Sequence, residues 1–197
     1  SVAVVNIGSV VKALVRNPTG STTAAISAGG DVTVSAVFTD DVDVLAVAGS
    51  GSINVGLGAE VAIVSDRSQA IASLDDGSSD ADGVRIVQAG QVTVSATATR
   101  TVAVTADGAA AGAAAAAGAS VARARIDSAA ATTASVGEHA QIGVQTGSSV
   151  AGLTVSASST DTVTAKTVAV VVGTLAGEGN EARAEIADTV TASIGGG

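Results

Sequence analysis

The sequence DVTVSA at residues 31–36 returns as QVTVSA at 91–96 and as LTVSA at 153–157. Matched residue by residue, the copies are 60 and then 61 residues apart. Each copy continues into a long alternation of Thr, Ser, Val and Ala, then a Gly-rich corner, then a second apolar stretch. Self-similarity at a fixed period is typical of stacked units that cannot bury their apolar faces alone. The sequence therefore indicates a repeat array rather than an enzyme built around a pocket.

The repeats divide the chain into a single array. We place a partial repeat at residues 1–15, full repeats at 16–74, 75–136 and 137–194, and a glycine tail at 195–197. A quasi-one-dimensional array implies one body rather than separate domains. Because the first and last repeats have the same phase, copies are expected to be able to continue one another, covalently or noncovalently.

Apolar and polar residues alternate strictly inside each copy. At residues 92–106 the even positions are mostly Val and Ala, and the odd positions are mostly Thr. Period-two alternation in β-branched residues predicts strands with one buried face, whereas a helix would scatter the same residues around its circumference. We predict an all-β fold, a parallel β-solenoid (β-helix) of tandem repeats. An antiparallel β-sandwich is the alternative, because alternation does not distinguish the direction of pairing.

A second strand is expected after each Gly-rich corner. At residues 53–63 the odd positions carry Ile, Val, Leu and Ala, and the even positions carry Asn, Gly and Glu, so the odd positions are expected to form the apolar face. The matching stretch of the second repeat is alanine-rich. Alanine favours helix in isolation, so a short helix at 113–117 is an alternative to the strand that the aligned copies favour.

One charged residue interrupts the apolar face at the same place in every copy: Asp40, Arg100 and Asp161. We favour a bend that turns this position into solvent. The alternative interpretation rests on the charges of these three residues, which alternate in sign. If successive repeats were neighbouring strands about 4.8 Å apart, these residues would form a charge-compensated ladder.

The sequence leaves open how many residues form one turn of the array. Each repeat forms either a single 60-residue turn or about three shorter coils. Direct stacking would place Arg125 beside Glu185, which favours the longer turn. It would also place Arg123 beside Arg183, which opposes it.

Composition excludes several classes of protein. The 197 residues carry a net charge of −9, and Phe38 is the only aromatic, so the basic surface and stacking platforms of nucleic-acid binders are missing. Acidic charge also disfavours anionic membranes, and the uncharged runs are too short to cross a bilayer. There is no cysteine, which removes disulfides and thiolate metal sites. Hydrophobic content of 47% comes mostly from small aliphatic residues, which suit thin, closely packed sheets.

No catalytic motif is present, and we expect no enzymatic activity and no cofactor. His139 is the only histidine, and it lies in a polar loop, where we expect a solvated side chain. No G-x-S-x-G elbow precedes a helix, and no Gly-rich stretch continues into Lys-Ser or Lys-Thr as a phosphate loop would.

Clustered carboxylates give one candidate metal site. The loop DDGSSDADG gathers four aspartates within eight residues: Asp75, Asp76, Asp80 and Asp82. Hard cations such as Ca²⁺ bind carboxylate and carbonyl oxygens on flexible loops, although we favour a solvated acidic turn. The next group to consider for a metal is Asp40, Asp41 and Asp43.

The repeats resemble the tandem units of giant secreted filamentous adhesins, the filamentous-haemagglutinin-like and leukotoxin-type proteins of Gram-negative bacteria. The matching stretches are Asp31–Ala36, Val44–Val64, Gln91–Ala96 and Leu153–Ala157. The resemblance implies a right-handed parallel β-helix, export to the cell surface and a scaffold or adhesive role. It brings no catalytic residue with it. This chain differs from the family in its few asparagines and single aromatic, so it lacks an evident Asn ladder.

These observations predict a structural or adhesive segment of a bacterial surface fibre, secreted or held at the cell surface. Two alternatives are a self-assembling filament or sheath subunit and a repeat module that binds calcium, glycan or ice. Expected partners are further copies, joined end to end through exposed strand edges, or a host or matrix glycan or protein. Nucleic acid and membrane insertion are not expected.

Overall fold

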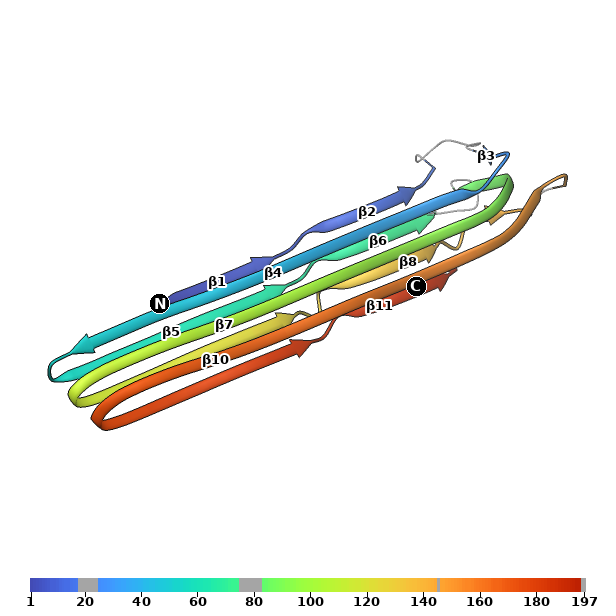
Figure 1. The fold of residues 1–197 in the computed structure, drawn as a ribbon. Helices are drawn as coiled ribbons and strands as arrows, with labels where there is room; N and C mark the ends of the chain where they lie inside the picture. The colour runs from blue at the N-terminus through green and yellow to red at the C-terminus, as the bar shows by residue number, and fades with distance from the viewer. Residues whose placement is uncertain (18–24, 75–82, 145, 196–197) are drawn as a thin grey trace.

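The structure, a computed structural model, describes residues 1–17, 25–74, 83–144 and 146–195. The regular structure of these residues is entirely β-strand (Figure 1). The alternative of a short helix at 113–117 is wrong, because these residues belong to a continuous strand. Within the described ranges there is accordingly no helix that could span a membrane.

Eleven strands make up the described part of the chain. They are β1 (Val2–Ile7), β2 (Val10–Val15), β3 (Ala25–Ser27), β4 (Val32–Ser52), β5 (Val55–Asp66), β6 (Gln69–Leu74), β7 (Arg85–Ile126), β8 (Ala131–Val136), β9 (Gln141–Ile142), β10 (Ser149–Ile186) and β11 (Thr189–Ile194).

Each repeat runs out along one long leg, reverses at a narrow tip and comes back along a second leg (Figure 1). The forward legs are β4 and the first halves of β7 and β10. The return legs are β5 with β6, the second half of β7 with β8, and the second half of β10 with β11; β1 and β2 form the return leg of the partial repeat. The reversals lie at residues 53–54, 113–114 and 174.

Successive repeats pair side by side, in parallel and in register. Val32 lies beside Val92 on the forward legs, and Val92 lies beside Leu153. The return legs pair in the orders β1-β5-β7-β10 and β2-β6-β8-β11. One repeat therefore pairs with the next along both legs, as a unit of about 60 residues rather than three short coils.

The antiparallel β-sandwich is wrong, because the pairings between the described strands are all parallel. The predicted all-β class with parallel sheets is confirmed, and it is compatible with a β-helix.

The core lies between the forward and return layers. Val92 and Val94 pack with Leu74 and Val136 from the return legs, and nearer the tip Val102 and Val104 pack with a second set of buried residues that includes Val64 and Ile126. Full burial of a valine stabilises the fold by roughly 1.5–3 kcal/mol. The predicted alternation is confirmed here: even positions at 92–106 are buried, and odd ones face outward. The outer hydroxyls also align, as Ser95 and Ser35 show with Oγ atoms 3.1 Å apart.

At the tip, the expected apolar face of residues 53–63 is wrong. The even positions Gly56 and Glu60 face the interior, while Ile53 and Leu57 are 87% and 69% exposed. The cause is the narrow space between the legs: a Cβ on Gly56 would overlap the carbonyl oxygen of Ala111. Only the face with glycine at this position can turn inward.

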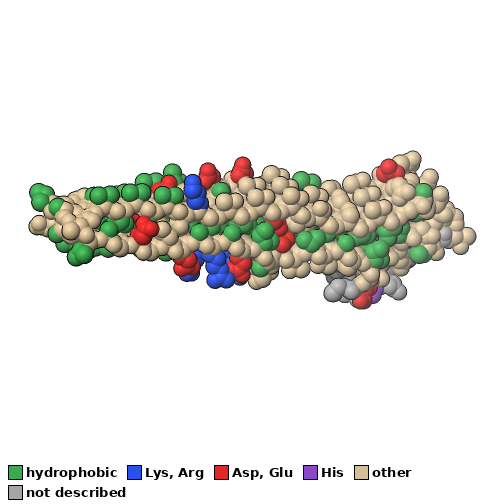
Figure 2. Space-filling model, turned by 60° about the horizontal axis from the view of Figure 1, so that its bottom comes forward, with side chains coloured by type: hydrophobic (Ala, Val, Ile, Leu, Met, Phe, Trp, Pro, Cys, Tyr) green, Lys and Arg blue, Asp and Glu red, His purple; other side chains and the backbone are tan. Residues whose placement is uncertain are grey.

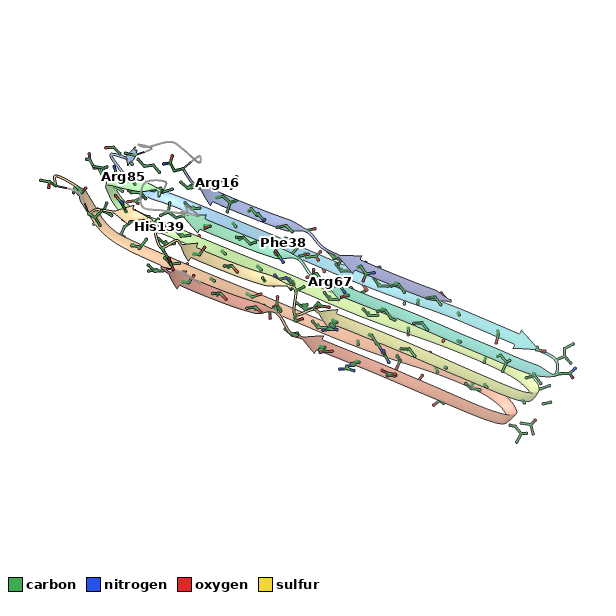
Figure 3. All side chains as sticks on the ribbon, turned by 180° about the vertical axis from the view of Figure 1, so that it is seen from behind. Arg16, Phe38, Arg67, Arg85 and His139 are labelled. Atoms are coloured by element: carbon green, nitrogen blue, oxygen red, sulfur yellow. The ribbon has the colours of Figure 1, made fainter. Side chains whose placement is uncertain are left out.

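The described part of the molecule is elongated along its legs (Figure 2). Neighbouring strands of a sheet are about 4.8 Å apart, so the molecule is much shorter along the direction in which the repeats stack than along its legs. The tip end carries much of the exposed apolar surface. Arg16, Arg85 and His139 lie at the opposite end, where the loops join successive repeats (Figure 3).

Candidate functional site

The most concentrated buried charge lies midway along the legs, where each return leg is interrupted between two strands. The interruptions fall at residues 8–9, 67–68, 127–130 and 187–188. Arg100 reaches toward them from the forward leg, with its side chain fully buried. We call the register partners Asp40, Arg100 and Asp161 the charge row.

Arg100 is held by hydrogen bonds from both layers. Its Nη1 donates to Ser159 Oγ at 2.9 Å and to Asp161 Oδ1 at 3.2 Å. Its Nη2 donates to the carbonyl oxygen of Ser68 at 3.0 Å. The guanidinium carbon lies 5.7 Å from the centroid of the Phe38 ring, which is within the range of a cation–π contact. The one aromatic side chain of the protein thus covers its most buried cation.

Two further carboxylates from the return legs approach Arg100. Asp66 Oδ2 lies 3.4 Å from Nε, and Asp188 Oδ2 lies 3.8 Å from Nη1. With Asp40 and Asp161 they form what we call the Arg100 cluster. Four carboxylates around one guanidinium leave a surplus of negative charge in a largely dry interior.

The expectation that the charge row turns into solvent is therefore wrong. Arg100 is fully buried, and Asp161 is nearly so, at 7% side-chain exposure. The alternative, a charge-compensated ladder between stacked repeats, is the arrangement found. Burial of an arginine is tolerated because its donors meet carboxylates and carbonyl oxygens.

Burial and, after it, a neighbouring carboxylate raise the pKa of two aspartates near Arg100. Burial raises the pKa of Asp40, and the nearby charge of Asp66 raises it further. Burial also raises the pKa of Asp188, followed by the charge of Asp161 beside it. Both carboxylates belong to the outermost repeats.

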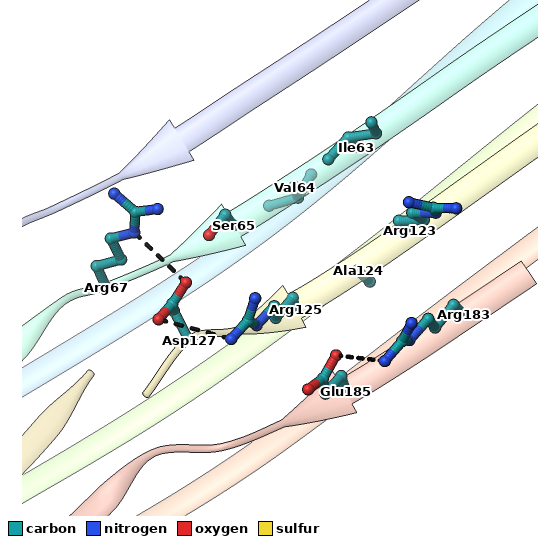
Figure 4. Close-up of a pocket in the computed structure, with 10 residues that line it drawn as sticks. All are labelled: Ile63, Val64, Ser65, Arg67, Arg123, Ala124, Arg125, Asp127, Arg183 and Glu185. Carbon is teal, nitrogen blue, oxygen red and sulfur yellow. Dashed lines mark ion pairs between the residues drawn. The ribbon is translucent and has the colours of Figure 1, made fainter. Parts of the chain in front are cut away.

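A second feature is a hollow of about 350 Å³ on the outer face of the return legs (Figure 4). Ten residues line it, four of them arginines: Arg67, Arg123, Arg125 and Arg183. We call it the arginine hollow. These four are a large share of the nine Lys and Arg residues in a chain of net charge −9.

Acidic neighbours partly neutralise the arginine hollow. Arg123 Nη2 lies 2.7 Å from Glu181 Oε1, and Arg183 Nη2 lies 3.2 Å from Glu185 Oε2. These pairs explain how Arg123 and Arg183 can be direct register partners despite their like charge. The predicted pairing of Arg125 with Glu185 in register is confirmed. Arg125 Nε is buried and makes no hydrogen bond in the described structure, so one donor at the hollow is unused.

The candidate metal ligands Asp75, Asp76, Asp80 and Asp82 lie outside the described residues. The second group is split by the strand: Asp40 faces the Arg100 cluster, whereas Asp41 and Asp43 are exposed on the outer face. Among the residues that the structure describes, no group of three His, Cys, Asp or Glu side chains is placed to hold a metal ion. His139 is half-buried in a loop rather than solvated as expected.

The sequence reasoning missed two buried acids of the return leg. Glu60 is 1% exposed and accepts a hydrogen bond from Ser120 Oγ at 2.8 Å. Asp66 is fully buried against Arg100. Both are even-numbered residues on the same buried face as Ala62 and Val64. Assigning the even-numbered face of this strand to the interior would have found them.

Comparison of the chain with protein-family models, with curated proteins and with solved structures finds no match.

Proposed function

We propose that this chain is a β-solenoid segment of a secreted bacterial surface fibre, with a structural or adhesive role and no catalysis. One observation carries the proposal: successive 60-residue repeats pair in parallel and in register along both legs. An arrangement of this kind can be lengthened by adding repeats without changing any existing contact. The likeness of the repeats to filamentous adhesins supports the same function.

Burial across the repeats supports a role as part of a longer array. Val92 in the central repeat is fully buried, whereas its register partners Val32 and Leu153 in the outer repeats are only partly buried. Each outer leg therefore leaves apolar surface and unpaired backbone groups that a further strand would cover. The self-assembling subunit is the form of this proposal in which the further strand belongs to another copy.

Electron microscopy of the purified chain, with and without calcium, tests the proposal. Discrete elongated particles are expected for a segment of a longer protein. Uniform filaments with a spacing of about 4.8 Å along their axis are expected for a self-assembling subunit. Globular particles without that spacing would contradict both. A filament that forms only with calcium would favour a calcium-binding module and direct attention to the loop at 75–82.

The arginine hollow favours a second candidate function, binding of an acidic polysaccharide. Guanidinium groups bind carboxylate and sulfate with paired hydrogen bonds, and the exposed fractions of Arg67 and Arg183 are 58% and 63%. Arg123 and Arg183 lie one strand spacing apart, so they offer a row of cations rather than a single point. An extended polyanion fits such a row better than a small ion does.

A further inference from the structure

Both sides of the stack are open in the described structure. On one side the outer strands are β4, β1 and β2; on the other they are β10 and β11. Because pairing between repeats is in register, the place of a further repeat is defined. Beyond β10 and β11 both legs are open, whereas beyond β4 only a forward leg is open, because β1 and β2 already form the return leg there. The next forward leg would lie against β4 or β10, and its member of the charge row would lie beside Asp40 or Asp161.

Inside the chain the charge row alternates in sign. Arg100 lies between Asp40 and Asp161 and hydrogen-bonds to the latter at 3.2 Å. Continuation of this alternation in either direction calls for a cation. Arginine also has enough donors to reach several oxygens at once, as Arg100 does.

Each open side also presents a carboxylate oxygen that lacks a hydrogen bond. Asp40 Oδ2 on one side and Asp188 Oδ2 on the other are buried and accept none in the described structure. Asp188 Oδ2 lies 3.8 Å from Arg100 Nη1. A guanidinium in the next repeat would lie where it could donate to these atoms.

A further repeat with aspartate in the charge row would bring the wrong charge to the same place. That aspartate would lie directly beside Asp161, at about 4.8 Å in an apolar interior. Like charges directly opposite on neighbouring strands are destabilising, and exclusion of water strengthens the repulsion. The apolar positions of such a repeat would still fit, because Val32 and Leu153 hold equivalent places in the repeat.

We propose that the open edge formed by β10 and β11 accepts a further 60-residue repeat whose charge-row residue is arginine, and that this residue, rather than the apolar strand pattern, discriminates against a repeat with aspartate at that position. The inference rests on the proposed function, because it assumes that the array is extended by repeats. The second repeat of this chain, with Arg100, is the model for such a partner.

Extension of the chain tests this directly. Residues 75–136 are fused after residue 194, which adds a fourth repeat with arginine in the charge row. In two further versions the added copy of Arg100 is replaced by Met or by Asp. We expect the midpoint of chemical unfolding and the protection of the added repeat from proteolysis to fall in the order Arg, Met, Asp. Replacement of the added copy of Arg123 by Asp is the matched control, because it makes the same charge change on the outer face.

Equal stability and protection of the Arg and Asp versions would overturn the charge-row inference while leaving the structural role intact. If none of the added repeats became protected, both the inference and the proposed function would fail. The two failures are therefore distinguishable in one experiment.

Discussion

At the scale of single residues, Arg100 has the largest predicted effect on stability. Arg100→Met leaves Asp66, Asp161 and Asp188 buried without their cation, and removal of one partner from a buried ion pair typically costs about 3–5 kcal/mol. We expect a loss of that order in urea unfolding. Arg183→Met is the control, because exposed ion pairs contribute roughly 0–1 kcal/mol. A loss for Arg100→Met no greater than for the control would show that the cluster contributes little to stability.

Asp188 gives a pH prediction at the same scale. Its pKa is raised above 3.8 in the folded chain, so the folded state binds this proton more tightly than the unfolded state does. Its contribution to stability is present below the unfolded pKa and is lost as pH rises through the folded pKa. We therefore expect Asp188→Asn to raise the free energy of unfolding at neutral pH, with a gain that shrinks as the pH is lowered toward 3.8.

Asp127 is the natural comparison, because its pKa is shifted the other way. A hydrogen bond from the backbone N–H of Ala129, followed by one from Ser128, lowers its pKa. Its contribution is present above the unfolded pKa and is lost as pH falls through the folded pKa. Asp127→Asn should thus destabilise the chain at neutral pH and have less effect in acid. If lowering the pH changed the effects of Asp188→Asn and Asp127→Asn on the free energy of unfolding in the same direction, the opposite pKa shifts of the two groups would be contradicted.

At the scale of elements, the tip depends on glycine because the two legs approach closely there. A side chain at position 56 would overlap the backbone of Ala111. We expect Gly56→Val to destabilise the chain by about 1–3 kcal/mol and to raise hydrogen exchange in the neighbouring strand ends. Gly51→Val is the control, since a Cβ there meets nothing within 4 Å. Similar effects of the two substitutions would argue against close approach at the tip.

The arginine hollow lies on the outer face of the return legs and gives a prediction about binding. If it binds acidic polysaccharide, Arg123→Ala combined with Arg183→Ala should weaken binding of a sulfated or carboxylated polysaccharide at least tenfold. Binding of a neutral polysaccharide of similar length should not change. Calorimetry at two salt concentrations checks this, because the charge-dependent part weakens with salt. Lys166→Ala is the control, because it removes one positive charge from the forward leg, outside the hollow. Retention of full affinity by the double variant would exclude the hollow as the site.

The elements also show how far the sequence could predict the structure. The forward legs were predictable in phase and in register, because Val or Ala alternates with Thr or Ser without interruption from residue 92 to the charge row. The return leg at 53–63 was not, because the larger side chains lie on its outer face. Only the distance between the legs at the tip decides that phase. Midway along the legs, the approach of the two layers brings Asp66 and Asp188 to Arg100, so the full cluster could not be read from spacing along the chain.

At the scale of the whole molecule, the direction of growth has a measurable signature. A filament formed by continued strand pairing would contain about 1.2 kDa per Å, because 60 residues of this 197-residue, 18.4 kDa chain fill one strand spacing of about 4.8 Å. Copies joined tip to loop along the legs would give a value several times smaller. Mass-per-length measurement by scanning transmission electron microscopy separates the two. A value far below 1.2 kDa per Å would contradict growth through the open edges.

The length of the legs has a mechanical consequence for any array built from these repeats. The 21 residues of β4 alone extend for about 70 Å at roughly 3.3 Å per residue, whereas two packed sheets are only about 10 Å apart. Such an array is a ribbon rather than a round rod. Resistance to bending grows steeply with thickness in the direction of the bend, so the ribbon would flex readily out of its plane and hardly at all within it. A ribbon of this form could follow a curved surface while resisting sideways bending within its own plane.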